Sequence, residues 1–264
     1  MAIVITVSNQ KGGVGKTTTS AALAAGLAEN GKKILGIDLD PQGNFGFCMG
    51  SEEHSDATIR DVLIGSVSVQ KAIRRVDRYD LLTSDILLGG SDLELKKTSR
   101  KEAVLKEALE PVMDFYDYII IDTPPALNLL TVNAYGVSDY LIIPMGTDIL
   151  SLVGLSQLKE TFDTVKTSLN KDLKVLGILL TRYDGRTNLS KDVSDMAQKL
   201  AESMQTKVFK SRIRSSIAIA EAPAQGESIF EYSPHAGGVR DYVKFVREVK
   251  KTIEEDSHHG KEKQ

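Results

Sequence analysis

Asn9-Gln10-Lys11-Gly12-Gly13-Val14-Gly15-Lys16-Thr17-Thr18 directly follows the apolar run Ile3–Val7 and leads into the alanine-rich segment Thr17–Glu29. A β-branched run, a glycine-rich turn and an alanine-rich segment predict a strand, a loop and a helix. Glycine has no Cβ, so backbone N–H groups can close around phosphate oxygens, and the N-terminus of the following helix adds partial positive charge there. The stretch therefore predicts a phosphate-binding loop.

The side chains of this loop suit a nucleotide with a divalent cation. Lys16 should reach the β- and γ-phosphates, and the Thr17 hydroxyl should coordinate Mg²⁺. The expected cofactors are therefore ATP and Mg²⁺. The residues expected to contact the nucleotide are Lys11, Gly12, Gly13, Val14, Gly15, Lys16, Thr17 and Thr18.

Two predicted strands end in aspartates. Lys33–Asp38 runs straight into Asp40, and strand alternation places Asp38 and Asp40 on the same side before Pro41 stops the extended pairing. Carboxylates at the carboxyl end of a parallel strand can bind Mg²⁺ through water or orient an attacking water. The residues alone leave open whether this pair acts on the nucleotide or only caps a turn.

The continuous apolar run Asp117–Asp122 predicts a buried central strand that ends in Asp122, where the carboxylate can accept from Mg²⁺-bound water or from the Thr17 hydroxyl. Further buried strands are expected at Asp139–Met145 and Lys174–Thr181. The alternation of strands and helices predicts an α/β fold with a doubly wound, mostly parallel sheet flanked by helices.

Length and composition fit one large domain. The chain has 264 residues, of which 41% are hydrophobic, and its formal net charge is −3. We expect residues 1–255 to form a single nucleotide-binding domain and the polar residues 256–264 to be a disordered tail. The single cysteine, Cys48, leaves no internal disulfide and argues against a zinc or iron–sulfur site. No stretch is long and apolar enough for a membrane span, and no signal peptide is apparent, so a cytoplasmic location is expected.

The loop also carries a second lysine, Lys11, that the general phosphate-loop pattern does not require. Lys-Gly-Gly-Val-Gly-Lys-Thr-Thr, residues 11–18, resembles the deviant Walker A motif of the ParA/MinD ATPases, and the resemblance covers nearly the whole chain. It implies that Lys11 crosses the interface of an ATP-sandwiched homodimer. It further implies that Asp40 positions the hydrolytic water and assists Mg²⁺ binding, and that Asp122 belongs to the Walker B segment. Lys11, Lys16 and Asp40 are then the catalytic residues, and Thr17, Asp40 and Asp122 the metal site.

The resemblance extends to residues near the end of the chain. It implies that the loop from Arg182 and the segment containing Pro223 border the purine, and that Arg186 belongs to a surface that holds DNA without sequence preference. The family's arginines before the Glu-Ala-Pro segment are replaced here by Ser215 and Ala218. The predicted DNA-binding set is therefore Arg186, Lys210, Arg212 and Arg214, with Lys96, Lys97, Arg100 and Lys101 as an alternative.

Four function classes share this kind of loop. A MinD-like regulator of cell division or cargo position is the main alternative, but it needs a C-terminal amphipathic helix, for which the polar tail has no apolar anchors. A relative of the nitrogenase iron protein needs cluster cysteines, and a ligase or kinase needs a substrate pocket that no motif indicates. The resemblance thus favours a partition ATPase with weak intrinsic activity, associated with the nucleoid and stimulated by a ParB-like centromere-binding protein. Without an N-terminal helix-turn-helix segment, operator binding is not expected.

Overall fold

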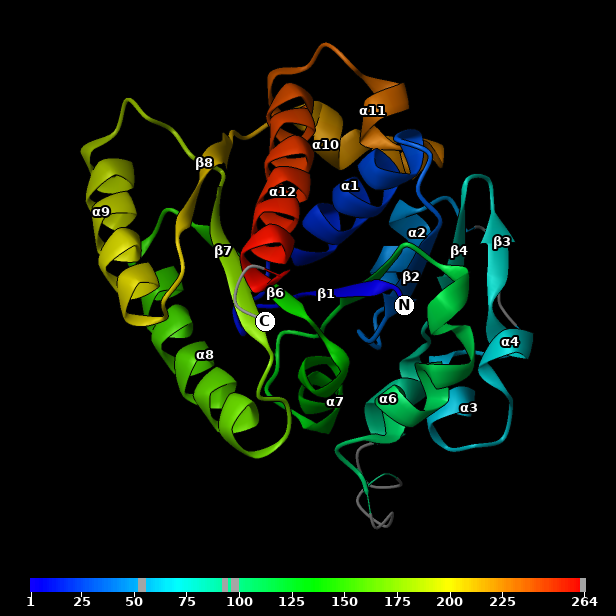
Figure 1. The fold of residues 1–264 in the computed structure, drawn as a ribbon. Helices are drawn as coiled ribbons and strands as arrows, with labels where there is room; N and C mark the ends of the chain where they lie inside the picture. The colour runs from blue at the N-terminus through cyan, green and yellow to red at the C-terminus, as the bar shows by residue number, and fades with distance from the viewer. Residues whose placement is uncertain (52–55, 92–94, 96–99, 262–264) are drawn as a thin grey trace.

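The computed structural model describes residues 1–51, 56–91, 95 and 100–261, with the side chains of 259–261 excepted. Its centre is an eight-stranded sheet in the order β3-β4-β2-β5-β1-β6-β7-β8 (Figure 1). All neighbouring strands pair in parallel except β3 and β4, which are antiparallel. The strands are β1 Ile3–Val7, β2 Ile34–Asp38, β3 Arg74–Val76, β4 Tyr79–Leu82, β5 Tyr118–Asp122, β6 Tyr140–Gly146, β7 Lys174–Thr181 and β8 Val208–Ile213.

Helices cover both faces of the sheet. One face packs against α1 Lys16–Glu29, α2 Asn44–Cys48, α11 Ile229–Tyr232 and α12 Gly237–Lys261, with α10 Ile217–Glu221 and η3 Ala222–Gln225 beside them. The other face packs against α3 Ile59–Leu63, α4 Val69–Ala72, α6 Val104–Leu109, α7 Leu129–Val137, α8 Ile149–Ser168 and α9 Asn188–Ser203. Two short 3₁₀ segments, η1 Ile86–Gly90 and η2 Glu110–Phe115, complete the described elements. The doubly wound α/β fold expected from the sequence is confirmed.

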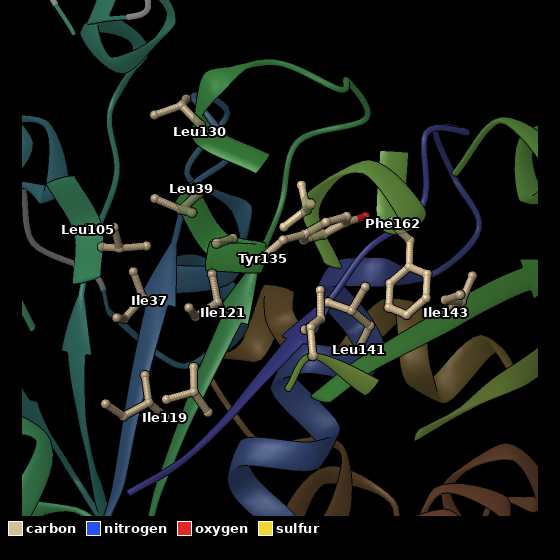
Figure 2. Packing of buried hydrophobic residues seen from close by; sticks show 14 of the residues in the cluster. Ile37, Leu39, Leu105, Ile119, Ile121, Leu130, Tyr135, Leu141, Ile143 and Phe162 are labelled. Atoms are coloured by element: carbon tan, nitrogen blue, oxygen red, sulfur yellow. The ribbon is translucent and has the colours of Figure 1, made fainter. Parts of the chain in front are cut away.

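Strand alternation divides the apolar residues between two cores. In β5, Ile119 and Ile121 lie in the core beneath α7 and α8, whereas Ile120 lies in the core beneath α1 and α12. Figure 2 shows part of the first core, with Tyr135 of α7 among labelled side chains of β2, β5 and β6. A strand buried on both faces needs a continuous apolar run, which explains why these strands were easy to predict from the sequence.

Several boundaries differ from the sequence predictions. The domain was expected to end at residue 255, but α12 continues to Lys261. Asp256 is tied to the sheet there, because its carboxylate accepts from the Tyr140 hydroxyl at 2.7 Å and from Lys174 Nζ at 2.6 Å. The expected disordered tail from residue 256 is therefore wrong as far as Lys261. The arginine-rich β3 was not predicted, because it has no apolar run.

Parallel pairing gathers one end of the sheet into a single surface. The loops that follow the carboxyl ends of β1, β2, β5, β6 and β7 all lie at this edge. The phosphate loop follows β1, Asp40 follows β2, Asp122 ends β5 and Arg182 follows β7. Ligands of open α/β sheets bind at such an edge, where the strand order reverses.

A close contact between β7 and β8 gives a test of the packing. A Cβ built on Gly177 would lie 2.6 Å from Cε2 of the buried Phe209, whereas a Cβ on Gly90 would meet nothing within 4 Å. Gly177→Ala should therefore lower the free energy of unfolding by about 1–3 kcal/mol through overpacking. Gly90→Ala is the matched control and should be near neutral. Urea denaturation measures both, and equal stability of the two variants would contradict the packing described here.

Candidate functional site: a nucleotide pocket beside a basic cavity

The phosphate loop has the backbone conformation that phosphate binding requires. Gly13 and Gly15 have φ angles of 70° and 85°, in the left-handed region that favours glycine, and α1 begins at Lys16 immediately afterwards. The loop is fixed to the neighbouring strands, because the Thr181 hydroxyl donates to the carbonyl oxygen of Val14 at 2.8 Å. The backbone N–H groups at the start of α1 therefore face a preformed anion site.

Lys16 is largely buried under this loop. Its Nζ donates to the carbonyl oxygen of Lys11 at 3.1 Å, so its side chain folds back across the loop. Burial lowers the pKa of Lys16, and the carboxylates of Asp122 and Asp40 oppose that shift. A cation in so desolvated a position is matched to anionic phosphate oxygens.

Asp122 connects the carboxyl end of β5 to the first turn of α1. Its two carboxylate oxygens accept separate hydrogen bonds, one from the Thr17 hydroxyl at 2.7 Å and one from the Ser20 hydroxyl at 2.8 Å. Burial raises the pKa of Asp122 to about 6, against the hydrogen bonds from Thr17 and Ser20 and the charge of Lys16. A buried carboxylate bound to a threonine hydroxyl beside a phosphate loop is a donor set suited to Mg²⁺.

The aspartates after β2 differ in their surroundings. Asp38 is buried, and its carboxylate accepts the backbone N–H groups of Asp40 at 2.9 Å and of Phe45 at 2.9 Å. Burial and the nearby Asp122 raise the pKa of Asp38 well above its usual range. Asp40 is half-exposed and accepts the N–H of Gln42 at 3.0 Å. Asp38 thus orders the turn that carries Asp40, and Asp40 remains accessible at the edge of the site.

Lys11 has a partner that the sequence analysis missed. Its Nζ lies 2.5 Å from a carboxylate oxygen of Asp148 and 3.3 Å from the Ser151 hydroxyl. Asp148 caps the N-terminus of α8 by accepting the N–H of Ser151. Partial burial would raise the pKa of Asp148, but the hydrogen bonds from Lys11 and Ser151 outweigh it and lower that pKa. Asp148 follows the carboxyl end of β6, as Asp122 ends β5, and this position could have identified Asp148 as a site residue from the sequence.

A cavity of about 300 Å³ adjoins the loop on the side of β7 and α12. Gly13, Gly15 and Thr18 form one wall, and Arg182 and Ser215 belong to the opposite wall. Arg182 has a φ of 50°, uncommon for a residue with a side chain. Pro223, predicted to border the purine, lines a separate small cavity with Thr18 and Cys48. The lining of the cavity beside the loop also includes Ser216, Ile219, Ala220 and Tyr242.

A second, larger cavity of about 590 Å³ lies beyond Arg182. All four residues predicted to bind DNA line it, although they come from the loop after β7 and from the region of β8. Asp184, Asp241 and Lys244 also line this cavity, and the sequence analysis included none of them. Arg182, Arg214 and Ser215 belong to both cavities, so the two share a wall.

The alternative basic segment receives less support. Lys96 and Lys97 lie outside the described residues. Arg100 lies 3.2 Å from the Glu107 carboxylate and Lys101 lies 3.7 Å from that of Glu102.

Burial raises the pKa of the Cys48 thiol to about 12, and within the described residues no cluster of His, Cys, Asp and Glu is arranged to hold a metal ion. No helix in that part of the chain has the length and apolarity needed to cross a membrane.

Comparison with known proteins agrees with this geometry. The sequence profile of the AAA domain family matches residues 2–175. The chain is 42% identical over 252 residues to the sporulation initiation inhibitor protein Soj of Bacillus subtilis, covering 94% of this chain and 98% of Soj. It is 38% identical over 251 residues to the chromosome partitioning protein ParA of Myxococcus xanthus, covering 94% of this chain and 88% of that protein. The chain belongs to the ParA/MinD family.

A solved structure shows what a relative with this fold binds. Cobyrinic acid a,c-diamide synthase from Mycobacterium smegmatis, solved with a bound ATP analogue and magnesium, is 33% identical to this chain, with a TM-score of 0.80. The match covers 94% of this chain and 93% of that one. The ParA/MinD fold is therefore shared by proteins whose names describe different biological tasks, and the task must be argued from the residues around the nucleotide pocket.

The raised pKa of Asp122 gives a pH-dependent prediction. The folded chain holds a proton on this carboxyl more readily than the unfolded chain, whose pKa is near 3.8. The stability associated with Asp122 is therefore present below about pH 4 and is lost as the pH rises through about 6. Asp122→Asn should gain stability relative to the parent between these values, because asparagine carries no buried charge.

Urea denaturation from pH 4 to pH 8 measures this difference. Carboxyl groups distant from Asp122 contribute equally to parent and variant, whereas Asp38, whose pKa the charge of Asp122 helps to raise, adds to the difference in the same direction. Unfolding curves for parent and variant that stay a constant distance apart over this range would show that Asp122 does not titrate as described.

Proposed function

We propose that this chain is a Mg²⁺-dependent ATPase of DNA partition, which dimerises around ATP and then binds DNA without sequence preference. The observation that carries the proposal is the position of two lysines, Lys11 and Lys16, in one phosphate loop whose Thr17 hydroxyl is bonded to the buried Asp122. The similarity to Soj and ParA supports the same conclusion.

In the proposed nucleotide site, the backbone of residues 11–18 and the Lys16 ammonium hold the phosphates. Thr17 and Asp122 would hold Mg²⁺, with Asp40 on the accessible side, and a bound ion would supply positive charge beside the phosphate oxygens. Asp40 orients the attacking water, since it is the half-exposed carboxylate of this edge. Arg182 and the segment 215–220 lie where the base would be placed.

Lys11 is the residue through which two copies would share their nucleotides. Its side chain is 27% exposed and lies at the carboxyl edge of the sheet, where a second copy would approach. An ammonium group that reaches the partner's phosphates couples dimerisation to ATP, because without the phosphates the two lysines would only repel one another. Asp148 offers Lys11 a carboxylate within its own chain.

The DNA-binding part of the proposal rests on the basic cavity. Arg186, Lys210, Arg212 and Arg214 contribute positive charge to one surface of a chain whose formal net charge is −3. A dimer would present two such cavities as one bivalent site, which raises the affinity without any new contact. A ParB-like centromere-binding protein would stimulate slow hydrolysis and so release the DNA. The chain would then act in the cytoplasm, associated with the nucleoid.

The first test concerns hydrolysis. Asp40→Ala should leave ATP binding intact and trap the dimer, because it removes the water-orienting carboxylate and leaves Lys16, Thr17 and Asp122 in place. Size-exclusion chromatography with ATP should show a persistent dimer, and a phosphate-release assay should show at least a tenfold lower rate, within the usual contribution of a positioned base. Ordinary turnover by the variant would show that another group orients the water.

The second test concerns the interface. Lys11→Ala should keep ATP affinity within a few-fold but lose ATP-dependent dimerisation and, with it, DNA binding. Lys199→Ala, which removes an exposed lysine from α9, is the matched control and should behave like the parent. Nucleotide titration, light scattering and DNA binding are measured on the same samples. If Lys11→Ala dimerises on ATP as the parent does, Lys11 is only a loop lysine.

A further inference from the structure

Two of the four arginines in the basic cavity are already bound to carboxylates of the same chain. Arg186 bonds Asp184 through a two-point fork, with Nε at 2.9 Å from one carboxylate oxygen and Nη2 at 2.7 Å from the other. These hydrogen bonds lower the pKa of Asp184 to about 2. The side chain of Arg186 is 90% exposed, so the fork stands in solvent at the mouth of the cavity.

Arg214 forms the second fork, with Asp241 of α12. Its Nε lies 2.7 Å from one oxygen of Asp241 and its Nη2 lies 2.8 Å from the other. The Asp241 side chain is only 8% exposed, whereas that of Arg214 is 57% exposed. Burial would raise the pKa of Asp241, but the hydrogen bonds from Arg214 outweigh it and lower that pKa.

Three other cations of the cavity have no such partner. Arg212 lies over the ring of Tyr183 at 4.5 Å and donates to the hydroxyls of Tyr183 and Ser194, which carry no charge. Lys210 and Lys244 also line the cavity. Within the described residues, no carboxylate oxygen lies within 4.0 Å of the charged groups of these three side chains.

A guanidinium fork that fits a carboxylate also fits the two free oxygens of a phosphodiester. We propose that Asp184 and Asp241 act as internal competitors of the DNA backbone, which hold Arg186 and Arg214 until phosphates replace them. Lys210, Arg212 and Lys244 then make the first contacts, and the two arginines follow by exchanging carboxylate for phosphate. This inference rests on the DNA binding of the proposed function and names the residues that restrain it.

The two forks differ in their connection to the nucleotide pocket. Arg214 lines both cavities, and Asp241 is followed on α12 by the buried Tyr242, whose hydroxyl lies 3.1 Å from the Thr19 hydroxyl of α1. Asp184 and Arg186 line only the basic cavity. The Arg214 fork is therefore the one that responds to ATP, and the Arg186 fork restrains binding in both nucleotide states.

The experiment uses the full chain and duplex DNA of unrelated sequences. Fluorescence anisotropy is measured with and without ATP at several salt concentrations for Asp184→Asn, Asp241→Asn and the double variant. Asp172→Asn, in the turn before β7 at the opposite edge of the sheet, makes the same change in net charge and is the control. Asparagine keeps a hydrogen-bond acceptor, and thermal unfolding checks that Asp241→Asn is folded.

Asp184→Asn should tighten binding about two- to fivefold in both nucleotide states, the range expected when an exposed ion pair no longer competes. Asp241→Asn should tighten it mainly without ATP, so that the ratio of the affinities with and without ATP falls. In the parent, an arginine that moves from its aspartate to a DNA phosphate leaves a bare carboxylate, which takes up a cation from solution. This uptake offsets part of the counterion release from the DNA, and the substitution by asparagine removes the offset. Each substitution should therefore steepen the slope of log affinity against log salt by about 0.9.

The outcomes separate this inference from the proposed function. If the parent binds DNA with ATP and both variants match Asp172→Asn in affinity and slope, the competitor role is overturned and the proposed function stands. If only Asp184→Asn shows the effect, the ATP-linked role of Asp241 is overturned. If neither parent nor variants bind any duplex at low salt in either state, both the competitor role and the DNA function are overturned.

Discussion

The hydrogen bond between the Thr17 hydroxyl and the buried carboxylate of Asp122 holds the site together, because it ties α1 to the central strand β5. Ser20 makes the same connection one turn further along the helix. A charged group with no exposed surface is costly unless its oxygens are bonded, and here both are. The first turn of α1 is therefore fixed relative to the sheet, and with it the backbone N–H groups of the phosphate loop.

The parallel sheet brings the remaining groups to the same place. Asp40, Asp148 and Arg182 follow three different strands, yet all three lie at the carboxyl edge beside the loop. Two apolar cores hold this edge rigid, one beneath α7 and α8 and one beneath α1 and α12 (Figures 1 and 2). Because α12 packs on α1 and its residue Asp241 bonds Arg214, the helix that completes the second core also reaches the basic cavity. Nucleotide pocket and basic cavity are thus parts of one rigid arrangement.

Positive charge at the basic cavity is partly neutralised by aspartates of the same chain. Arg186 and Arg214 are each paired with an aspartate, while Arg212, Lys210 and Lys244 have no carboxylate partner in the described part of the chain. The formal net charge of the chain is −3, so the molecule as a whole does not attract a polyanion. A surface whose cations are partly neutralised then binds a polyanion weakly as a single copy. Two copies held together by ATP would double the number of contacts, which fits the proposed dependence of DNA binding on the nucleotide.

The sequence by itself determined the phosphate loop, the buried strands and the aspartates at their ends. These are local features: glycine spacing fixes the loop, and a strand buried on both faces needs an uninterrupted apolar run. The Thr17–Asp122 contact was also predictable, because both residues belong to recognised segments that a parallel sheet brings to one edge. The capping pair Thr58 and Asp61 of α3 is likewise a local feature of the sequence.

Only the tertiary structure decided which charges meet. Lys11 and Asp148 are 137 residues apart, and Arg214 and Asp241 are 27 residues apart on different elements, so no local pattern links them. The linings of the two cavities beside Thr18, and the extension of α12 to Lys261, likewise depend on how helices pack on the sheet. Ion pairs and cavity walls form between surfaces that the chain brings together only after folding, whereas a loop or a buried strand is specified by its own residues.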